Sequence, residues 1–142
     1  MGVASMYNVR VERSAGYAGI AFILLLIVGA FLPGTPPLPD APAADVATFL
    51  DSHHSVWLFS GWLGIPETAF FLWFIVQLRA YLRLAPQLDD GLPTYLLTGG
   101  VAGGVLALLL SLVQIVMGFR SPSELGLPVI RVLYDIFNAG GA

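Results

Sequence analysis

Three long apolar runs dominate this sequence and limit what it can fold into. They extend over residues 15–32, 56–78 and 94–119. A helix rises about 1.5 Å per residue, so even the shortest run spans about 27 Å, close to the thickness of the hydrocarbon core of a bilayer. The sequence therefore predicts an all-α transmembrane bundle with three full membrane-spanning helices.

The composition agrees with a protein whose surface faces lipid. The chain of 142 residues is 57% hydrophobic and only 11% charged, whereas about a quarter of the residues of a soluble domain are charged. The length suits one bundle and leaves no room for a second domain. We therefore expect a single transmembrane domain over residues 1–142 and not a soluble enzyme.

Two further counts exclude classes of function. The sequence contains no cysteine, which excludes disulfides, iron–sulfur clusters and thiolate metal sites. The six basic residues are all arginine, they do not cluster, and the formal net charge is −3. Nucleic-acid binding therefore has no electrostatic support.

The first apolar run has a second interpretation, a cleaved signal peptide. Basic residues precede it, and the small residues Ala41, Ala43 and Ala44 follow it. However, the run is longer than a typical signal core and the small residues lie well beyond its end. We therefore expect a retained helix.

Shorter segments connect the three runs. Residues 34–42 are rich in proline, which predicts an extended surface loop. Residues 43–54 are amphipathic and predict a short interfacial helix, while 85–93 and 121–128 predict polar turns. The final segment, 129–142, predicts a helix in which Arg131 and Asp135 can pair, either interfacial or part of a fourth crossing.

The placement of arginine predicts the orientation of the chain. Four of the six arginines, Arg10, Arg13, Arg79 and Arg83, lie on one side of the membrane if all three runs cross it. Cytoplasmic loops carry an excess of arginine and lysine. We therefore expect a multi-pass protein of the cell (inner) membrane with a cytoplasmic N-terminus.

Glu67 is the most informative single residue because it lies at the middle of the second run. An ionised carboxylate there costs about 2.5–3.5 kcal/mol on insertion scales. It must face protein or water, be protonated, or have a partner, and such residues often mark proton or ion pathways. Pro66 precedes it, so we expect a kink and a free carbonyl at Trp62. A purely structural, protonated glutamate is the alternative.

The third run carries small residues that recur along the helix, which predicts close helix packing. The set comprises Gly99, Gly100, Gly103, Gly104 and Ala107. Antiparallel packing of the second and third helices would place position 67 level with about position 107. Ser60, Ser111 and Gln114 could then form a small polar pocket with Glu67, a candidate proton or ion site.

Other residues give weaker indications of a cofactor. His53 and His54 are neighbours, so their side chains diverge on a helix and cannot easily share a metal. A single axial ligand to haem or chlorophyll is an option for either one, but an interfacial, solvent-facing pair is the favoured interpretation. An aromatic cluster close to Glu67 could line a quinone, lipid or pigment site. It comprises Phe70, Phe71, Trp73 and Phe74.

The order of features resembles that of a group of uncharacterised multi-pass bacterial membrane proteins. The segments that carry the resemblance are Thr48-Phe49-Leu50-Asp51-Ser52-His53, Leu78-Arg79-Ala80-Tyr81-Leu82-Arg83 and Arg131-Val132-Leu133-Tyr134-Asp135-Ile136. Members of the group are longer and have more helices, so the resemblance implies a fragment or a shortened relative. It implies no activity for any residue.

Three classes of function follow from these features. The leading expectation is a non-enzymatic accessory or structural subunit of a membrane complex or homo-oligomer, with the small-residue face of the third helix as its docking surface. The second is a small proton- or ion-coupled transporter that uses Glu67. The third is a pigment- or quinone-binding subunit of an electron-transfer complex. The cofactor, if there is one, is not specified.

Overall fold

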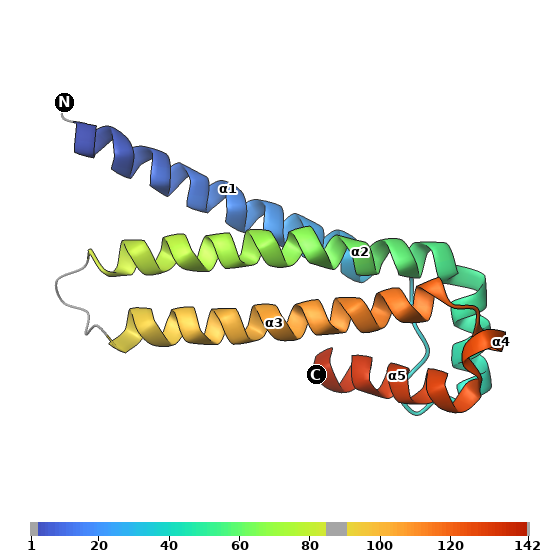
Figure 1. Cartoon of the computed structure of the whole chain (residues 1–142). Helices are drawn as coiled ribbons and strands as arrows, with labels where there is room; N and C mark the ends of the chain where they lie inside the picture. The colour runs from blue at the N-terminus through green and yellow to red at the C-terminus, as the bar shows by residue number, and fades with distance from the viewer. Residues whose placement is uncertain (1–2, 85–90, 142) are drawn as a thin grey trace.

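The computed structural model describes residues 3–84 and 91–141, with side chains over 14–84 and 91–140. Within these ranges all regular structure is helical (Figure 1). The helices are α1 (Val3–Phe31), α2 (Ala43–Leu82), α3 (Gly91–Phe119), α4 (Pro122–Leu125) and α5 (Leu127–Gly141). Most of the polar turn predicted over 85–93 lies outside the described residues.

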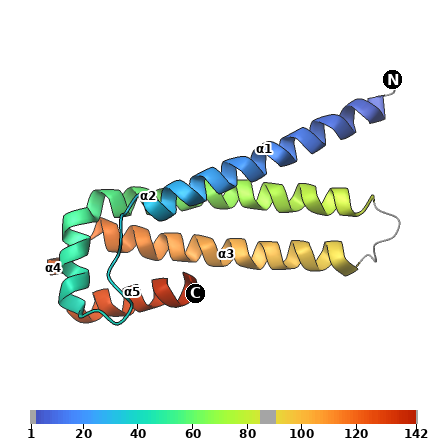
Figure 2. The same cartoon turned by 180° about the vertical axis from the view of Figure 1, so that it is seen from behind.

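Three of these helices are long and apolar enough to cross a membrane. They are Ser14–Phe31 within α1, with a mean hydropathy of 2.1, α2, with 1.4, and α3, with 2.2. Figures 1 and 2 show α2 and α3 side by side and antiparallel, with α1 crossing α2 at an angle. The predicted all-α bundle of three potential spans and a C-terminal helix is confirmed.

Helix α2 contains a sharp bend, and it lies near its beginning. His53 has φ −121° and ψ 15°, outside the helical region, and Figure 1 shows the first turns of α2 at a steep angle to the rest. The stretch before the bend corresponds to the short helix predicted over 43–54. Helical structure resumes directly after the bend rather than after a loop.

The expected kink at Pro66 is wrong. His53 is the one residue of α2 whose backbone leaves the helical region, and α2 shows no further sharp bend after its first turns in Figure 1. Proline removes a single hydrogen bond of the helix. Helix α2 packs closely against α3 two residues before Pro66, where a Cβ at Gly64 would overlap Ser111, and the backbone stays helical through this stretch.

The C-terminal segment folds back along the bundle. The loop predicted over 121–128 contains the single turn α4, and Gly126, with φ +75°, makes the sharp turn into α5. Helix α5 then runs antiparallel to α3 (Figures 1 and 2), and a Cβ at Gly140 would overlap the side chain of Leu110. This helix lies against α3 and α2, which places it alongside the third span rather than across its end.

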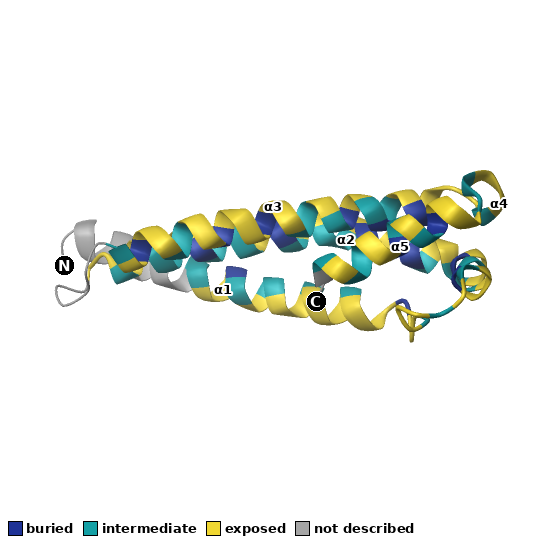
Figure 3. Ribbon diagram, turned by 90° about the horizontal axis from the view of Figure 1, so that it is seen from below, coloured by how far each residue is buried: buried dark blue, intermediate teal, exposed yellow. Residues whose placement is uncertain are grey.

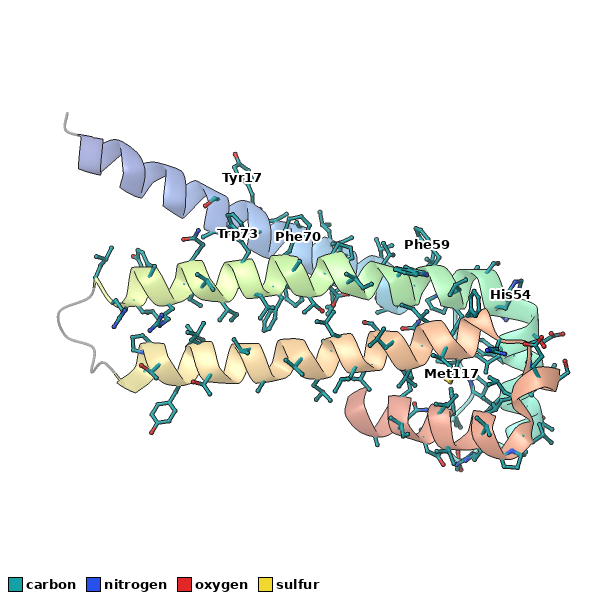
Figure 4. All side chains as sticks on the ribbon, viewed as in Figure 1. Tyr17, His54, Phe59, Phe70, Trp73 and Met117 are labelled. Carbon is teal, nitrogen blue, oxygen red and sulfur yellow. The ribbon has the colours of Figure 1, made fainter. Side chains whose placement is uncertain are left out.

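The buried core gathers where α2 bends and α5 folds back. Its members come from the beginning of α2, the end of α3 and the middle of α5, as the dark blue segments of Figure 3 show. The cluster comprises Val46, Leu50, Trp57, Met117, Ile130 and Tyr134. In Figure 4 the Met117 side chain lies between α3 and α5, and Phe59 projects from the side of α2 away from α3. Phe70 and Trp73 lie on the side of α2 that faces α1, where they line a cavity with Tyr17 and Ala18.

Candidate functional site

Glycines on α2 and α3 allow these two helices to pack closely, and the packed pair forms one wall of the candidate site. A Cβ at Gly118 would lie 2.7 Å from the backbone nitrogen of Leu58, and one at Gly61 would lie 2.9 Å from the Ile115 side chain. A Cβ at Gly64 would overlap Oγ of Ser111. Both helix backbones therefore need glycine here, and the resulting register lies within one turn of the predicted one.

The predicted small-residue strip of α3 divides into two faces. Gly100 and Gly104 meet α2, since a Cβ at either would come within 3 Å of the Ile75 or Leu72 side chain. Gly99 and Gly103 face open space, with nothing within 4 Å of an added Cβ. Ala107 is half-buried. Only the first pair thus packs against α2, because residues adjacent in a helix point about 100° apart.

Helix α1 closes the second wall by crossing α2. A Cβ at Gly19 would lie 3.1 Å from the Phe74 ring, and the rings of Phe22 and Phe71 pack with centroids 5.1 Å apart. Closer to the end of α1, Oγ of Ser60 donates a hydrogen bond of 2.7 Å to the carbonyl of Gly29. These contacts hold α1 over the face of α2 that carries Glu67.

Between these walls lies a cavity of about 400 Å³. It is lined by all four residues that the sequence predicted to form a polar pocket: Glu67, Ser60, Ser111 and Gln114. Ser60, Ser111 and Gln114 are buried, and Glu67 is half-buried. Among the described residues, no hydrogen bond or ion pair reaches the Glu67 carboxylate. The structure thus brings together the predicted residues around an unpaired acid.

The remaining lining residues were not predicted from the sequence. Leu26 and Ala30 come from α1, Pro33 and Pro36 from the connection to α2, and Phe137 from α5. Trp57 also lines the cavity; it is only 2% exposed, and its indole Nε1 is buried with no hydrogen-bond partner. The rings of Trp57 and Phe137 pack with centroids 5.4 Å apart, which brings α5 into the site.

The proline-rich connection over 32–42, here called the strap, is tied to α5. Arg131 donates to the carbonyls of Ala41 and Pro39, each at 2.6 Å, and pairs with Asp135 at 3.0 Å. Tyr134 donates from its hydroxyl to the carbonyl of Pro37. The predicted pairing of Arg131 with Asp135 is confirmed. No feature of the sequence indicates that Arg131 and Tyr134 both bind a distant loop.

A second cavity, of about 210 Å³, lies on the other side of Glu67. It shares Leu26 and Glu67 with the first cavity, and its other lining residues are Phe22, Thr68, Phe71, Gly103 and Ala107. The hydroxyl of Thr68 donates to the carbonyl of Gly64 within its own helix, so this cavity is almost wholly apolar. Glu67 stands at the boundary between a polar and an apolar space.

The two histidines lie at the bend and line neither of these cavities. His53 is half-buried, stacks on Phe49 with ring centroids 4.6 Å apart, and has Nδ1 3.1 Å from the Phe49 carbonyl. His54 is exposed near Asp51 and Arg120 (Figure 4 shows its place). No group of three or more His, Asp or Glu side chains that could hold a metal occurs in the described part of the chain.

No family profile, no curated protein and no solved structure matches this chain. The resemblance to multi-pass bacterial membrane proteins therefore stays an expectation based on the sequence pattern. Function has to be inferred from the residues of the two cavities.

Proposed function

We propose that this protein is a small, non-enzymatic, proton- or ion-coupled transporter in which Glu67 carries the exchanged charge. The observation that carries this proposal is the convergence of Glu67, Ser60, Ser111 and Gln114 on one cavity between helices. An ionisable residue within a membrane-spanning helix is expensive, so it usually marks an ion or proton path. Glu67 has no partner in the described structure that would make it a purely structural group.

The position of Glu67 between two cavities supports exchange rather than simple binding. Both cavities are lined by its side chain, and they lie at different depths along α2. A carboxyl group that faces both spaces can take up a proton or cation from one and release it to the other. Transporters commonly place such a site near the bilayer midplane, between helices that move relative to one another.

The non-enzymatic part of the proposal has support from the chemistry of the cavity. Nucleophilic catalysis needs a hydroxyl paired with a base, but the hydroxyls of Ser60 and Ser111 both donate to backbone carbonyls. Neither histidine lines the cavity. Among the described residues, Glu67 is the only ionisable side chain that lines the cavity.

A second candidate function, an accessory subunit or self-associating protein, is supported by a different surface. Helix α1 diverges from α3 in Figures 1 and 2, and Gly99 and Gly103 face the open space on α3. Small residues let a further transmembrane helix approach closely. In this function a helix of another subunit or of a second copy would occupy that space.

We further propose the inner-membrane location with a cytoplasmic N-terminus. Arg10 and Arg13 belong to the beginning of α1, and Arg79 and Arg83 lie at the end of α2. These two helix ends lie at one end of the bundle in Figure 1. At the opposite end lie two arginines, Arg120 and Arg131, and Arg131 is paired with Asp135. This distribution supports the positive-inside orientation.

Charge displacement on a solid-supported membrane tests the transporter function directly. The full chain is reconstituted into vesicles and exposed to rapid jumps of pH or of Na⁺ concentration. We expect a transient current in the wild type that is lost in Glu67→Gln and kept in Glu124→Gln, a matched change on the exposed helix α4. Wild-type vesicles without current, or Glu67→Gln vesicles with undiminished current, would overturn the proposal.

The accessory function is tested by native mass spectrometry of protein extracted gently from its own membrane. A stoichiometric complex that is lost in Gly103→Leu but retained in Glu67→Gln would support it. A wild-type monomer, together with a current that depends on Glu67, would exclude it in favour of transport.

A further inference from the structure

The polar groups of the larger cavity are unbalanced in favour of hydrogen-bond acceptors. Each serine hydroxyl has one proton, and both protons are already used: Ser60 donates to Gly29 at 2.7 Å and Ser111 to Ala107 at 2.9 Å. What each hydroxyl still offers is its oxygen lone pairs. Both serines therefore face the cavity as acceptors.

The other polar side chains extend this pattern. Gln114 donates from Nε2 to the Trp57 carbonyl at 3.4 Å, which leaves its Oε1 as an acceptor. The Glu67 carboxylate accepts through both oxygens when ionised. The remaining donors are the second N–H of Gln114 and the indole N–H of Trp57, which is shut off from solvent. Among the described residues, no arginine or histidine lines the cavity, and the sequence contains no lysine.

An acceptor-rich cavity with one acidic group selects a cation that can donate hydrogen bonds. A divalent metal is a poor match, because hard divalent ions take about six to eight oxygen ligands, usually from several carboxylates. The described residues contain no group of three or more candidate metal ligands. A positively charged nitrogen with several N–H bonds fits the acceptors better.

The size and the apolar lining of the cavity indicate that the cation carries an apolar body. The volume of about 400 Å³ falls within the range of sites for organic ligands. Leu26, Pro33 and Pro36 line it together with the aromatic rings of Trp57 and Phe137. Aromatic faces attract organic cations, and more strongly where water is excluded.

We propose that this cavity binds a lipophilic ammonium ion in exchange for the proton of Glu67. The ammonium enters as R–NH₃⁺, the protonated Glu67 carboxyl releases its proton to water, and the carboxylate pairs with the ammonium. Charge is conserved in the cavity, since one cation replaces one proton. This inference rests on the proposed transporter function and specifies its substrate class.

Binding of two related amines tests the proposal. The probes are 2-phenylethylammonium and its N,N,N-trimethyl analogue, which share the charge and the aromatic ring but differ in N–H donors. Calorimetry with the purified full chain in detergent should show the primary ammonium bound at least tenfold more tightly. As the pH falls and Glu67 becomes protonated, the affinity for the primary ammonium should decrease by up to tenfold for each pH unit.

Matched variants locate the binding. Glu67→Gln should lose the binding of the primary ammonium, while Glu124→Gln keeps it. Ser111→Ala, which removes one acceptor, should weaken binding about three- to tenfold. Since Glu67→Gln could alter folding, size-exclusion profiles and helical circular dichroism are compared, and Glu67→Asp should keep pH-dependent binding.

The outcomes separate this inference from the function on which it rests. Equal binding of the two probes, or ammonium binding that persists in Glu67→Gln, would overturn the inference. Absence of ammonium binding, with a pH-jump or Na⁺-jump current that still depends on Glu67, would also overturn it and leave the transporter function standing. Absence of both ammonium binding and any such current would refute the function itself.

Discussion

The two ends of the bundle are built differently. At the strap end, α2, α3 and α5 bury large side chains together, among them Trp57, Met117 and Tyr134. At the opposite end α5 is absent and α1 diverges from α3 (Figure 1). Of the large, fully buried side chains among the described residues, Pro93 alone lies at that end. The cavity with Glu67 lies where the tightly packed end meets the open one.

The difference between the two ends explains how a small bundle can hold a binding site. The packed end provides fixed walls, since dense interiors resist deformation. Helix α1 is held mainly by α2, and Ala18 is its only buried side chain among those described. We therefore expect α2, α3 and α5 to form the rigid part of the site and α1 to be the helix that moves against it.

The largest expected effect comes from removing the aromatic centre of the packed end. Trp57→Ala should lower the free energy of unfolding by about 3–5 kcal/mol, because a buried aromatic side chain leaves a cavity behind. Trp73→Ala is the matched control, since Trp73 is 56% exposed and should change stability far less. Unfolding in mixed micelles measures both, and equal losses would show that the two regions do not differ in packing.

A smaller effect should follow from crowding the glycine contacts. Gly118→Ala places a Cβ 2.7 Å from the Leu58 backbone, so the helices must separate, at a cost of about 1–3 kcal/mol. Gly103→Ala meets nothing within 4 Å, so we expect its thermal midpoint in detergent to equal that of the wild type. A large loss in Gly103→Ala would show that another helix covers this face.

The smallest of the three losses of stability is expected when a contact of the strap is removed. Tyr134→Phe removes the hydroxyl that donates to Pro37 and should cost about 0.5–1.5 kcal/mol, the net value of one hydrogen bond. Tyr95→Phe is the control, because Tyr95 is 79% exposed. Limited proteolysis within 32–42 should also become faster in Tyr134→Phe alone. Unchanged proteolysis would mean that the strap is held by other contacts.

The sequence predicted the helices well because apolar length is a strong signal. It also predicted which polar residues gather in the cavity, since the position of Glu67 and antiparallel packing restrict which residues of α3 lie level with it. The sequence predicts a kink at Pro66, whereas α2 bends at His53 in the structure. A sequence shows that proline removes one helix hydrogen bond, but it does not show how the helix packs at that point, and the bend depends on both.

Contacts between residues far apart in the sequence could not be predicted from it. Nothing in the local pattern of Arg131 or Tyr134 shows that they bind carbonyls of the strap. The division of the α3 glycines into a packed pair, Gly100 and Gly104, and an open pair, Gly99 and Gly103, depends on helix rotation. Periodicity identifies a face, but a partner helix must be known before the face can be assigned.

Infrared difference spectroscopy tests most directly the claim that Glu67 exchanges a proton within the cavity. Films of the reconstituted protein are titrated with pH, and the carboxylic C=O stretching band is followed in the wild type, Glu67→Gln and Glu124→Gln. We predict a band in the wild type and in Glu124→Gln that disappears as the pH rises and is missing in Glu67→Gln. A Glu67→Gln difference spectrum identical to that of the wild type would contradict the claim.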